Sequence, residues 1–284
     1  MTLVIAQKKN KKISFASDSR ISFGNQGHID FGIKIFSVPV KIYSPTDSNK
    51  KTKTLDYDHT IGLAVIGSAV NAYLIKESIN EILQNLQYAP TWSDISMDKI
   101  ANLVFKIYKK TTADLTKVLQ KGGVCELILG GYCPKQNKIK VFKYYLDLSN
   151  SPYTPEIIEI LIDEGSIDFS GSGKIEAEKM FKSDKKLIPL KILRSIVNNP
   201  DIKGVGGGLQ YGEFKNRNFE VLGVEDYSTN PDNSFKEYLL TLRGITLYKG
   251  EFESKLDDFH IAYNFITPFK DEIDNAFKIG IDNI

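Results

Sequence analysis

The sequence is poor in the residues that bind metals and form disulfides. Its 284 residues include only two cysteines and three histidines. Cys125 and Cys133 have seven residues between them beside an apolar stretch. This is not a metal-binding spacing, so we interpret both as core thiols in a reducing compartment. His28, His59 and His260 form no pair at helical spacing, and the sequence therefore predicts no metal site.

A long apolar run and an excess of one charge are also missing. No stretch reaches the ~18 apolar residues of a membrane-spanning helix, and polar residues at 7–12 interrupt the apolar start of the chain. The 37 basic residues nearly balance the 35 acidic residues, which predicts no long-range attraction to nucleic acid or to a membrane surface. With 42% hydrophobic residues the chain is long enough to bury a core. We expect a globular, cytoplasmic protein.

The apolar pattern predicts an α+β protein. Apolar runs predict strands at 2–7, 13–18, 32–38, 40–43, 60–66, 124–131, 139–145, 166–170, 204–214 and 219–224. Apolar residues at spacings of three and four predict helices at 68–86, 97–119, 174–181 and 187–197. Because strands and helices occur in separate blocks, the order favours helices outside stacked antiparallel sheets over a parallel βαβ sheet.

A turn-rich segment at 228–233 predicts a boundary near Asp226. We expect a domain at 1–226 and a C-terminal extension at 227–284 that packs on it and serves oligomer contacts. Within the extension, 235–242 is interpreted as a helix and 259–266 as a strand.

Thr2 combines two reactive groups if Met1 is removed, which the small second residue predicts. A threonine at the new N-terminus carries a hydroxyl nucleophile and an α-amine. The unperturbed pKa of such an amine is roughly 7.7 to 8.0, near the working pH of a general base. The pattern predicts Thr2 as a self-activated nucleophile.

Three charged residues are expected close to Thr2. If the first hairpin turns around Asn10, Asp18 lies opposite Thr2 with about 5 Å between the Cβ atoms. Arg20 then points to the same side as Asp18. Lys34 interrupts an apolar run, and a buried lysine is costly unless a carboxylate such as Asp18 pairs with it. Its ammonium would lower the pKa of the Thr2 hydroxyl or amine. An ordinary edge-strand lysine is the alternative interpretation of Lys34.

These residues resemble the β-type proteasome and bacterial HslV group of threonine hydrolases, and the bacterial proteasome-like Anbu proteins at least as closely. Asp18 and Lys34 stand sixteen and thirty-two residues after Thr2, as in that family. The resemblance covers about 2–224. It is carried by Thr2-Leu3-Val4-Ile5, Ala16-Ser17-Asp18-Ser19-Arg20, Lys34-Ile35 and Ile66-Gly67-Ser68-Ala69.

The resemblance implies a four-layer αββα Ntn-hydrolase sandwich, with two stacked antiparallel sheets between helical layers. It also implies the roles of several residues. Gly67 would supply the oxyanion-hole N–H, and Ser22 and Ala69 would hold the substrate backbone. Arg20, Val65 and Ala69 would help to line the pocket for the residue before the cut.

The family also has a Gly-Ser-Gly segment whose serine supports the threonine amine. Gly171-Ser172-Gly173 matches it, so Ser172 is the fourth catalytic candidate beside Thr2, Asp18 and Lys34. The chain departs from eukaryotic β subunits at 201–208, where the expected aspartate and serine are not in place before the glycines. The contacts of these two residues would be lost or taken over by the backbone.

The predicted function is two-step amide hydrolysis of polypeptides by Thr2, without a cofactor, in a homo-oligomeric ring or stacked assembly; an unfoldase partner stays open. One alternative is a small-molecule amidase of the wider Ntn-hydrolase group. Another is an inactive structural ring subunit, like the α-type members of the family. Those subunits begin with a helix, whereas Thr2 begins a predicted strand.

Overall fold

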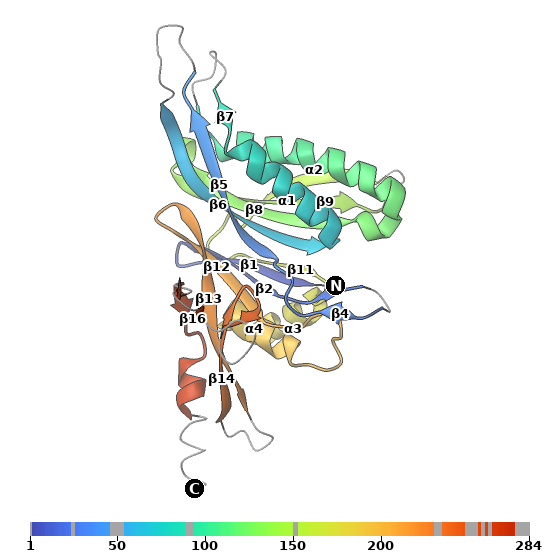
Figure 1. Cartoon of the computed structure of the whole chain (residues 1–284), viewed down its shortest axis with the longest axis vertical. Helices are drawn as coiled ribbons and strands as arrows, with labels where there is room; N and C mark the ends of the chain where they lie inside the picture. Colours follow the sequence, from blue (N-terminus) through green and yellow to red (C-terminus); the bar gives the residue numbers. More distant parts are fainter. Residues whose placement is uncertain are drawn as a thin grey trace.

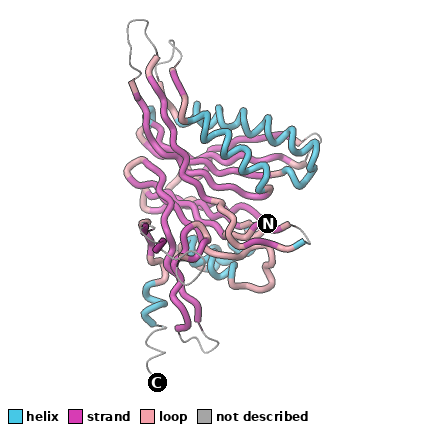
Figure 2. Tube along the Cα trace, viewed as in Figure 1, coloured by secondary structure: helices cyan, strands magenta, loops and turns pink. Residues whose placement is uncertain are grey.

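The computed structural model describes residues 2–23, 26–45, 54–88, 94–149, 153–229, 235–247, 255–256, 259–260 and 263–275. Two large β-sheets lie face to face, and each carries a pair of helices on its outer side (Figures 1 and 2). In the described part of the chain, no helix has both the length and the apolar character needed to cross a bilayer.

The first sheet has six strands in the order β10-β9-β8-β6-β5-β7. All its neighbours are antiparallel except β5 and β7. Its strands are β5 (Ile35–Tyr43), β6 (Leu55–Gly67), β7 (Leu86–Gln87), β8 (Cys125–Cys133), β9 (Lys138–Asp147) and β10 (Thr154–Ile160). Helices α1 (Ala69–Leu83) and α2 (Met97–Leu119) cover its outer face through a large apolar cluster. Ser68 and Ser96 cap these helices, because their hydroxyls accept backbone N–H groups of the first turn.

The second sheet has eight strands in the order β11-β1-β2-β12-β13-β14-β15, with β18 paired to β13. Its strands are β1 (Leu3–Lys9), β2 (Lys12–Asp18), β11 (Ile167–Gly171), β12 (Leu209–Lys215), β13 (Asn218–Thr229), β14 (Phe235–Leu242), β15 (Ile245–Thr246) and β18 (Phe265–Ile266). Helices α3 (Lys174–Ser183) and α4 (Pro189–Val197) pack on its outer face. Shorter elements of the described residues include β3 (Ile21–Ser22) with β4 (His28–Ile29), β16 (Lys255–Leu256) with β17 (Phe259–His260), and the 3-10 turns η2 (Gln120–Gly123) and η3 (Pro134–Gln136).

An apolar layer joins the inner faces of the two sheets. The rings of Phe15 of β2 and Phe219 of β13 pack in a tilted arrangement with centroids 5.2 Å apart, and Phe214 of β12 contacts both rings. Gly62 of β6 makes room for them, since a β-carbon there would lie 2.5 Å from the Phe219 ring. Large rings on one sheet thus enter spaces that a missing side chain leaves on the other.

The sequence predicted the first hairpin but placed its register one residue away from the observed one. Asn10 and Lys11 form a two-residue turn, both with positive φ (53° and 61°), and Val4 therefore pairs with Ser17. Continued along the strands, this register brings Asp18 opposite Leu3 instead of Thr2. Two strands predicted around Pro39 are one continuous strand, β5, and β10 was not predicted.

The helix predicted for residues 235–242 is wrong, because this segment is strand β14. It contains good helix formers, yet β13 offers a long partner with which it pairs antiparallel. The tertiary partner overrides the local preference. The strand predicted at 259–266 is observed only as β17 and β18, and 261–262 lie outside the described residues.

The segment after residue 226 is joined to the rest of the fold. Strand β13 runs through that position without a break, and β14 and β15 extend the same sheet. Arg194 of α4 binds Asp226 (2.9 Å) and Glu272 (3.0 Å), and its guanidinium lies over the ring of Phe269. The division into 1–226 and 227–284 stays a prediction.

We expect Phe219→Ala to lower the free energy of unfolding by about 3 to 5 kcal/mol, because it empties the centre of the layer between the sheets. Phe219 is 1% exposed. Val118→Ala, at a side chain that is 78% exposed at the end of α2, is the control and should change stability little. Chemical denaturation of both variants measures the difference, and equal midpoints would contradict the assigned layer.

Candidate active site

Thr2 stands directly before β1, between the two strands that pair with β1. It is 4% exposed. On one side β11 leads into Ser172, whose Oγ accepts the Thr2 N–H (3.2 Å) and donates to the Thr2 carbonyl (3.4 Å). On the other side β2 ends at Asp18, which accepts the N–H of Leu3 at 2.9 Å. The backbone of residues 2–3 is therefore held from both neighbouring strands.

The Asp18 carboxylate is fully buried and surrounded by four donors. Its Oδ1 accepts the Leu3 N–H and the Lys34 ammonium, the latter at 2.8 Å. Its Oδ2 accepts the backbone N–H groups of Arg20 (3.2 Å) and Gly206 (3.1 Å). The predicted pairing of Asp18 with Lys34 is confirmed, and the carboxylate satisfies the hydrogen-bonding needs of a buried charge.

Lys34 lies just before β5 with a side chain that is 4% exposed. Burial lowers the pKa of its ammonium, and the neighbouring Asp18 carboxylate opposes that shift. The interpretation of Lys34 as an ordinary edge-strand lysine therefore does not hold. The lysine is a buried cation that releases its proton more easily than an exposed lysine does.

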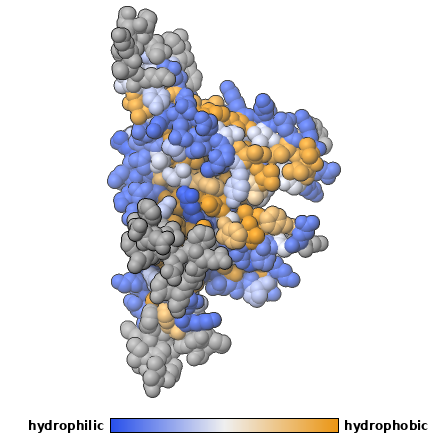
Figure 3. Space-filling view, viewed as in Figure 1, coloured by the Kyte–Doolittle hydropathy of each residue, from blue (hydrophilic) through white to orange (hydrophobic). Residues whose placement is uncertain are grey.

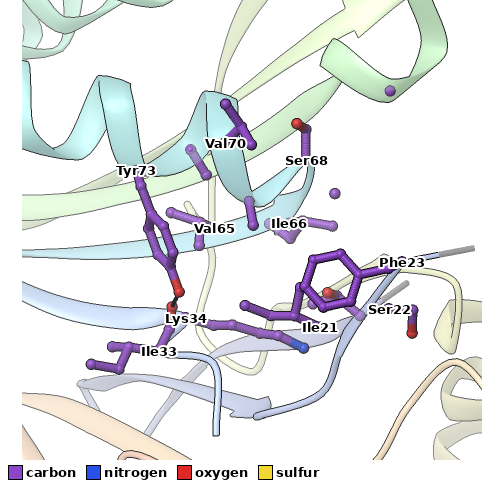
Figure 4. A pocket seen from close by; sticks show the side chains of 15 residues that line it. Ile21, Ser22, Phe23, Ile33, Lys34, Val65, Ile66, Ser68, Val70 and Tyr73 are labelled. Carbon is purple, nitrogen blue, oxygen red and sulfur yellow. Dashed lines mark hydrogen bonds between the residues drawn. The ribbon is translucent and has the colours of Figure 1, made fainter. Parts of the chain in front are cut away.

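Thr2 and Lys34 open into a common cavity of about 200 Å³, which we call the Thr2 cavity. Four more of the residues singled out from the sequence line it: Ser22, Val65, Gly67 and Ala69. Figure 4 shows the Lys34 side chain extending across the cavity, with Ile21 and Phe23 beside its ammonium end. The cavity thus lies between the segment around β3 and the start of α1.

Gly67 joins β6 to the amino end of α1 at the wall of the Thr2 cavity. Its φ is +89°, and a β-carbon there would lie 2.7 Å from the Val124 carbonyl oxygen. Only glycine fits this position without strain. The amino end of a helix carries partial positive charge, so this wall favours a developing negative charge.

Arg20, predicted to line the pocket, does not line the Thr2 cavity. Its guanidinium binds both carboxylate oxygens of Asp30 (2.7 and 2.9 Å) and the Lys203 carbonyl. The same contact holds the pKa of Asp30 below its usual range. The Arg20 guanidinium is directed to Asp30 and not to the Thr2 cavity, because two charge-assisted hydrogen bonds to a carboxylate are stronger than contacts with apolar side chains.

Two residues that the sequence did not point to complete the site. Gln210 of β12 is fully buried; its amide donates to the carbonyls of Asp18 (3.2 Å) and Gly32 (2.8 Å) and accepts the Lys34 N–H (2.9 Å). A single amide in strand β12 was the only available signal. Gly206 binds Asp18 through its N–H, and its carbonyl accepts the Ser19 and Arg20 N–H groups.

Neither of the two cysteines lines the Thr2 cavity. Cys125 and Cys133 are both buried and free, as predicted, and burial raises the pKa of Cys125 to about 12. Such a thiol is a poor nucleophile. Within the described residues, no group of three or more His, Cys, Asp or Glu is arranged to hold a metal ion.

No family model matches the sequence, and a search of curated proteins finds no match either. Solved structures do match. A Gly-1 mutant of Anbu from Hyphomicrobium sp. strain MC1 has a TM-score of 0.54 and 14% identity, covering 100% of this chain and 98% of that one. Anbu from Yersinia bercovieri, described as an ancestral beta-subunit, has a TM-score of 0.51 and 17% identity, covering 77% and 86%. The helical assembly of the Anbu complex from Pseudomonas aeruginosa has 0.50 and 16%, covering 75% and 80%.

Two packed sheets flanked by helices, with a buried threonine at the start of the first strand, make this a mixed α+β protein that agrees with an Ntn-hydrolase-like fold. More specifically, the chain has the fold of Anbu, which confirms the resemblance seen in the sequence.

Because Lys34 relies on Asp18 as its counter-charge, we expect Asp18→Asn to lower the free energy of unfolding by about 3 to 5 kcal/mol. The double variant Asp18→Asn/Lys34→Met should lose less than the sum of the two single variants, since it removes both charges. Asp30→Asn breaks a pair whose carboxylate is 42% exposed and should cost about 1 kcal/mol or less. Thermal and denaturant unfolding measure all four; additive losses would contradict a coupled buried pair.

Proposed function

We propose that the chain is an N-terminal threonine hydrolase that cleaves peptide bonds. The observation that carries the proposal is the joint placement of Thr2 and the buried Asp18–Lys34 pair at one cavity, with Ser172 on the Thr2 nitrogen. In this proposal, loss of Met1 gives Thr2 a free α-amine. Its hydroxyl and its base then belong to one residue.

The Thr2 hydroxyl oxygen attacks the substrate carbonyl, and its proton passes through a water to the α-amine. Lys34 lowers the pKa of the hydroxyl by its charge, and Asp18 keeps that ammonium in place. Ser172 orients the amine through the contact that it makes with the Thr2 nitrogen. The Gly206 N–H donates to the Asp18 carboxylate in this network. This contact supports the proposal that a backbone group replaces the aspartate and serine side chains that the sequence lacks near the glycines.

The Gly67 N–H and the amino end of α1 stabilise the oxyanion of the tetrahedral intermediate. The carbon–nitrogen bond of the substrate then breaks, and the leaving amine takes the proton held by the α-amine. This leaves an ester on Thr2. Water activated by the same amine attacks the ester, releases the carboxylate product and restores the hydroxyl. Ser22 and Ala69, both at the cavity wall, hold the substrate backbone.

The proposal includes an architecture and an assembly. We assign the two sheets and their outer helices to a four-layer αββα sandwich, with 227–284 as an extension packed on the domain. The Pseudomonas aeruginosa neighbour is described as a helical assembly. We propose that this chain forms a homo-oligomer. An active site that faces the interior of an assembly is shielded from surrounding folded proteins, so its nucleophile does not cleave them.

The test is the intact mass of the purified protein before and after incubation with a peptide epoxyketone, which needs a hydroxyl and a free α-amine on one residue. We expect loss of the Met1 mass followed by a single adduct. Thr2→Ala should abolish the adduct and turnover of an unfolded protein while the fold is kept. Leu74→Asp, outside the cavity on α1, is the control.

Retained Met1, or an adduct that survives Thr2→Ala, would overturn the mechanism. An adduct without digestion of an unfolded protein would move the function to the small-molecule amidase alternative.

A further inference from the structure

The Thr2 cavity is lined on most sides by apolar side chains. Ile21 and Phe23 come from the segment around β3, Ile33 from the residues before β5, Val65 from β6, and Val70 and Tyr73 from α1. Figure 4 shows them around Lys34, and in Figure 3 apolar residues flank the recess between the α1–α2 half and the other half of the molecule.

The Lys34 ammonium and the Tyr73 hydroxyl, both at this cavity, already have partners. The Lys34 ammonium binds Asp18 at 2.8 Å, and the Tyr73 hydroxyl donates to the Ile33 carbonyl at 3.0 Å. Arg20 is bound by Asp30 outside the cavity. A charged substrate side chain would therefore lose its water without gaining a counter-charge, and a cation would also meet the Lys34 ammonium.

From these two observations we infer that the Thr2 cavity selects an apolar side chain, of leucine or phenylalanine type, on the residue before the cleaved bond. The inference rests on the proposed function and names its substrate class. Two features produce the selectivity. The cavity walls bury an apolar side chain favourably, and the charged side chain among the described lining residues, Lys34, is already paired with Asp18.

Ala69 offers a test that the fold tolerates. It is the first residue of α1, where an added carboxylate is favoured by the helix dipole, and it faces the cavity wall. Ala69→Asp should therefore place a negative charge at the cavity without unfolding the chain. Leu74→Asp adds the same charge five residues further along α1, at a side chain that is 49% exposed and outside the cavity.

The probes are three peptide epoxyketones that differ only in carrying leucine, lysine or aspartate next to the reactive group, and the readout is the rate of adduct formation by mass. In the unmodified protein we expect the leucine probe to react at least roughly tenfold faster than either charged probe. Ala69→Asp should raise the lysine-to-leucine rate ratio by roughly tenfold, and Leu74→Asp should leave it unchanged.

A charged probe that reacts fastest in the unmodified protein, or an unchanged ratio in Ala69→Asp, would overturn the selectivity. No adduct with any probe would instead overturn the proposed function.

A second, independent observation concerns the C-terminal part of the chain. The turn between β14 and β15 packs against the segment that follows Asp18. A β-carbon built at Gly244 would lie 2.3 Å from the Ser19 Cβ, and one at Gly208 would lie 2.8 Å from the Gly244 Cα. Ser19 is fully buried and cannot move aside easily, because its N–H donates to Gly206 and its carbonyl accepts the Gly32 N–H.

We infer that the β14–β15 turn is a positioning element of the active site: Gly244 supports Ser19 from outside, and Ser19 fixes the neighbouring Asp18. The inference also rests on the proposed function. It assigns a role to a hairpin that lies in the segment predicted from the sequence to be a C-terminal extension. Gly244→Ala should press on Ser19, strain the segment that holds Asp18 and lower the limiting rate of adduct formation with the leucine probe, by roughly tenfold or more, with the half-saturating probe concentration unchanged.

Gly165→Ala is the matched control. Gly165 has nearly the same φ as Gly244 (81° and 82°), but its β-carbon would meet nothing within 4 Å. Its N–H bonds Lys8, at the end of β1 remote from Thr2. It therefore carries the same backbone strain without the contact. Equal rates per folded molecule in Gly244→Ala and Gly165→Ala would overturn the positioning role.

If Gly244→Ala folds poorly, the same substitution is tested in the Ser19→Gly variant. Removing the Ser19 side chain makes room for the added methyl group. Gly244→Ala should then slow the reaction of the Ser19→Gly protein no more than Gly165→Ala does. A full additional loss in the double variant would contradict the contact. An inactive unmodified protein would instead overturn the proposed function.

Discussion

The Asp18–Lys34 ion pair is the interaction on which the rest of the site depends. A buried ammonium is tolerated only with a counter-charge, and a buried carboxylate only with enough donors. Asp18 meets both needs, since it binds Lys34, the Leu3 N–H and the Gly206 N–H at once. The start of β1, the end of β2 and the glycine-rich loop before β12 are thereby tied to one carboxylate.

The parts of the site that the sequence predicted most directly lie close together along the chain. Thr2, Asp18 and Lys34 lie within the first 34 residues, and their spacing already matched the family. Ser172 is 170 residues away from Thr2, so only the resemblance pointed to it. The hairpin register missed by one residue because composition alone does not say whether the turn takes one residue or two, and here Asn10 and Lys11 both adopt positive φ.

What the sequence missed depends on partners that are distant along the chain. Gln210 looks like one of several polar residues of its strand, and only the fold brings it to the carbonyls of Asp18 and Gly32. Residues 235–242 carry helix-forming residues, and their strand conformation requires β13 beside them. Arg20 was assigned to the pocket because of its place after Asp18. The competing carboxylate of Asp30, ten residues further on, decided its direction.

The glycines near Asp18 make sense as one feature. A β-carbon at Gly206 would lie 2.3 Å from the Arg20 guanidinium carbon, one at Gly207 would lie 2.3 Å from the Ser19 Oγ, and Gly208 meets Gly244 in the same way. Three backbone segments therefore approach closely where side chains would keep them apart. Close approach lets the Gly206 N–H reach the carboxylate directly, so a site that lacks two polar side chains at this loop can still hold Asp18 with backbone groups. The same closeness makes the geometry of Asp18 depend on the β14–β15 turn, far along the chain from the threonine that it serves.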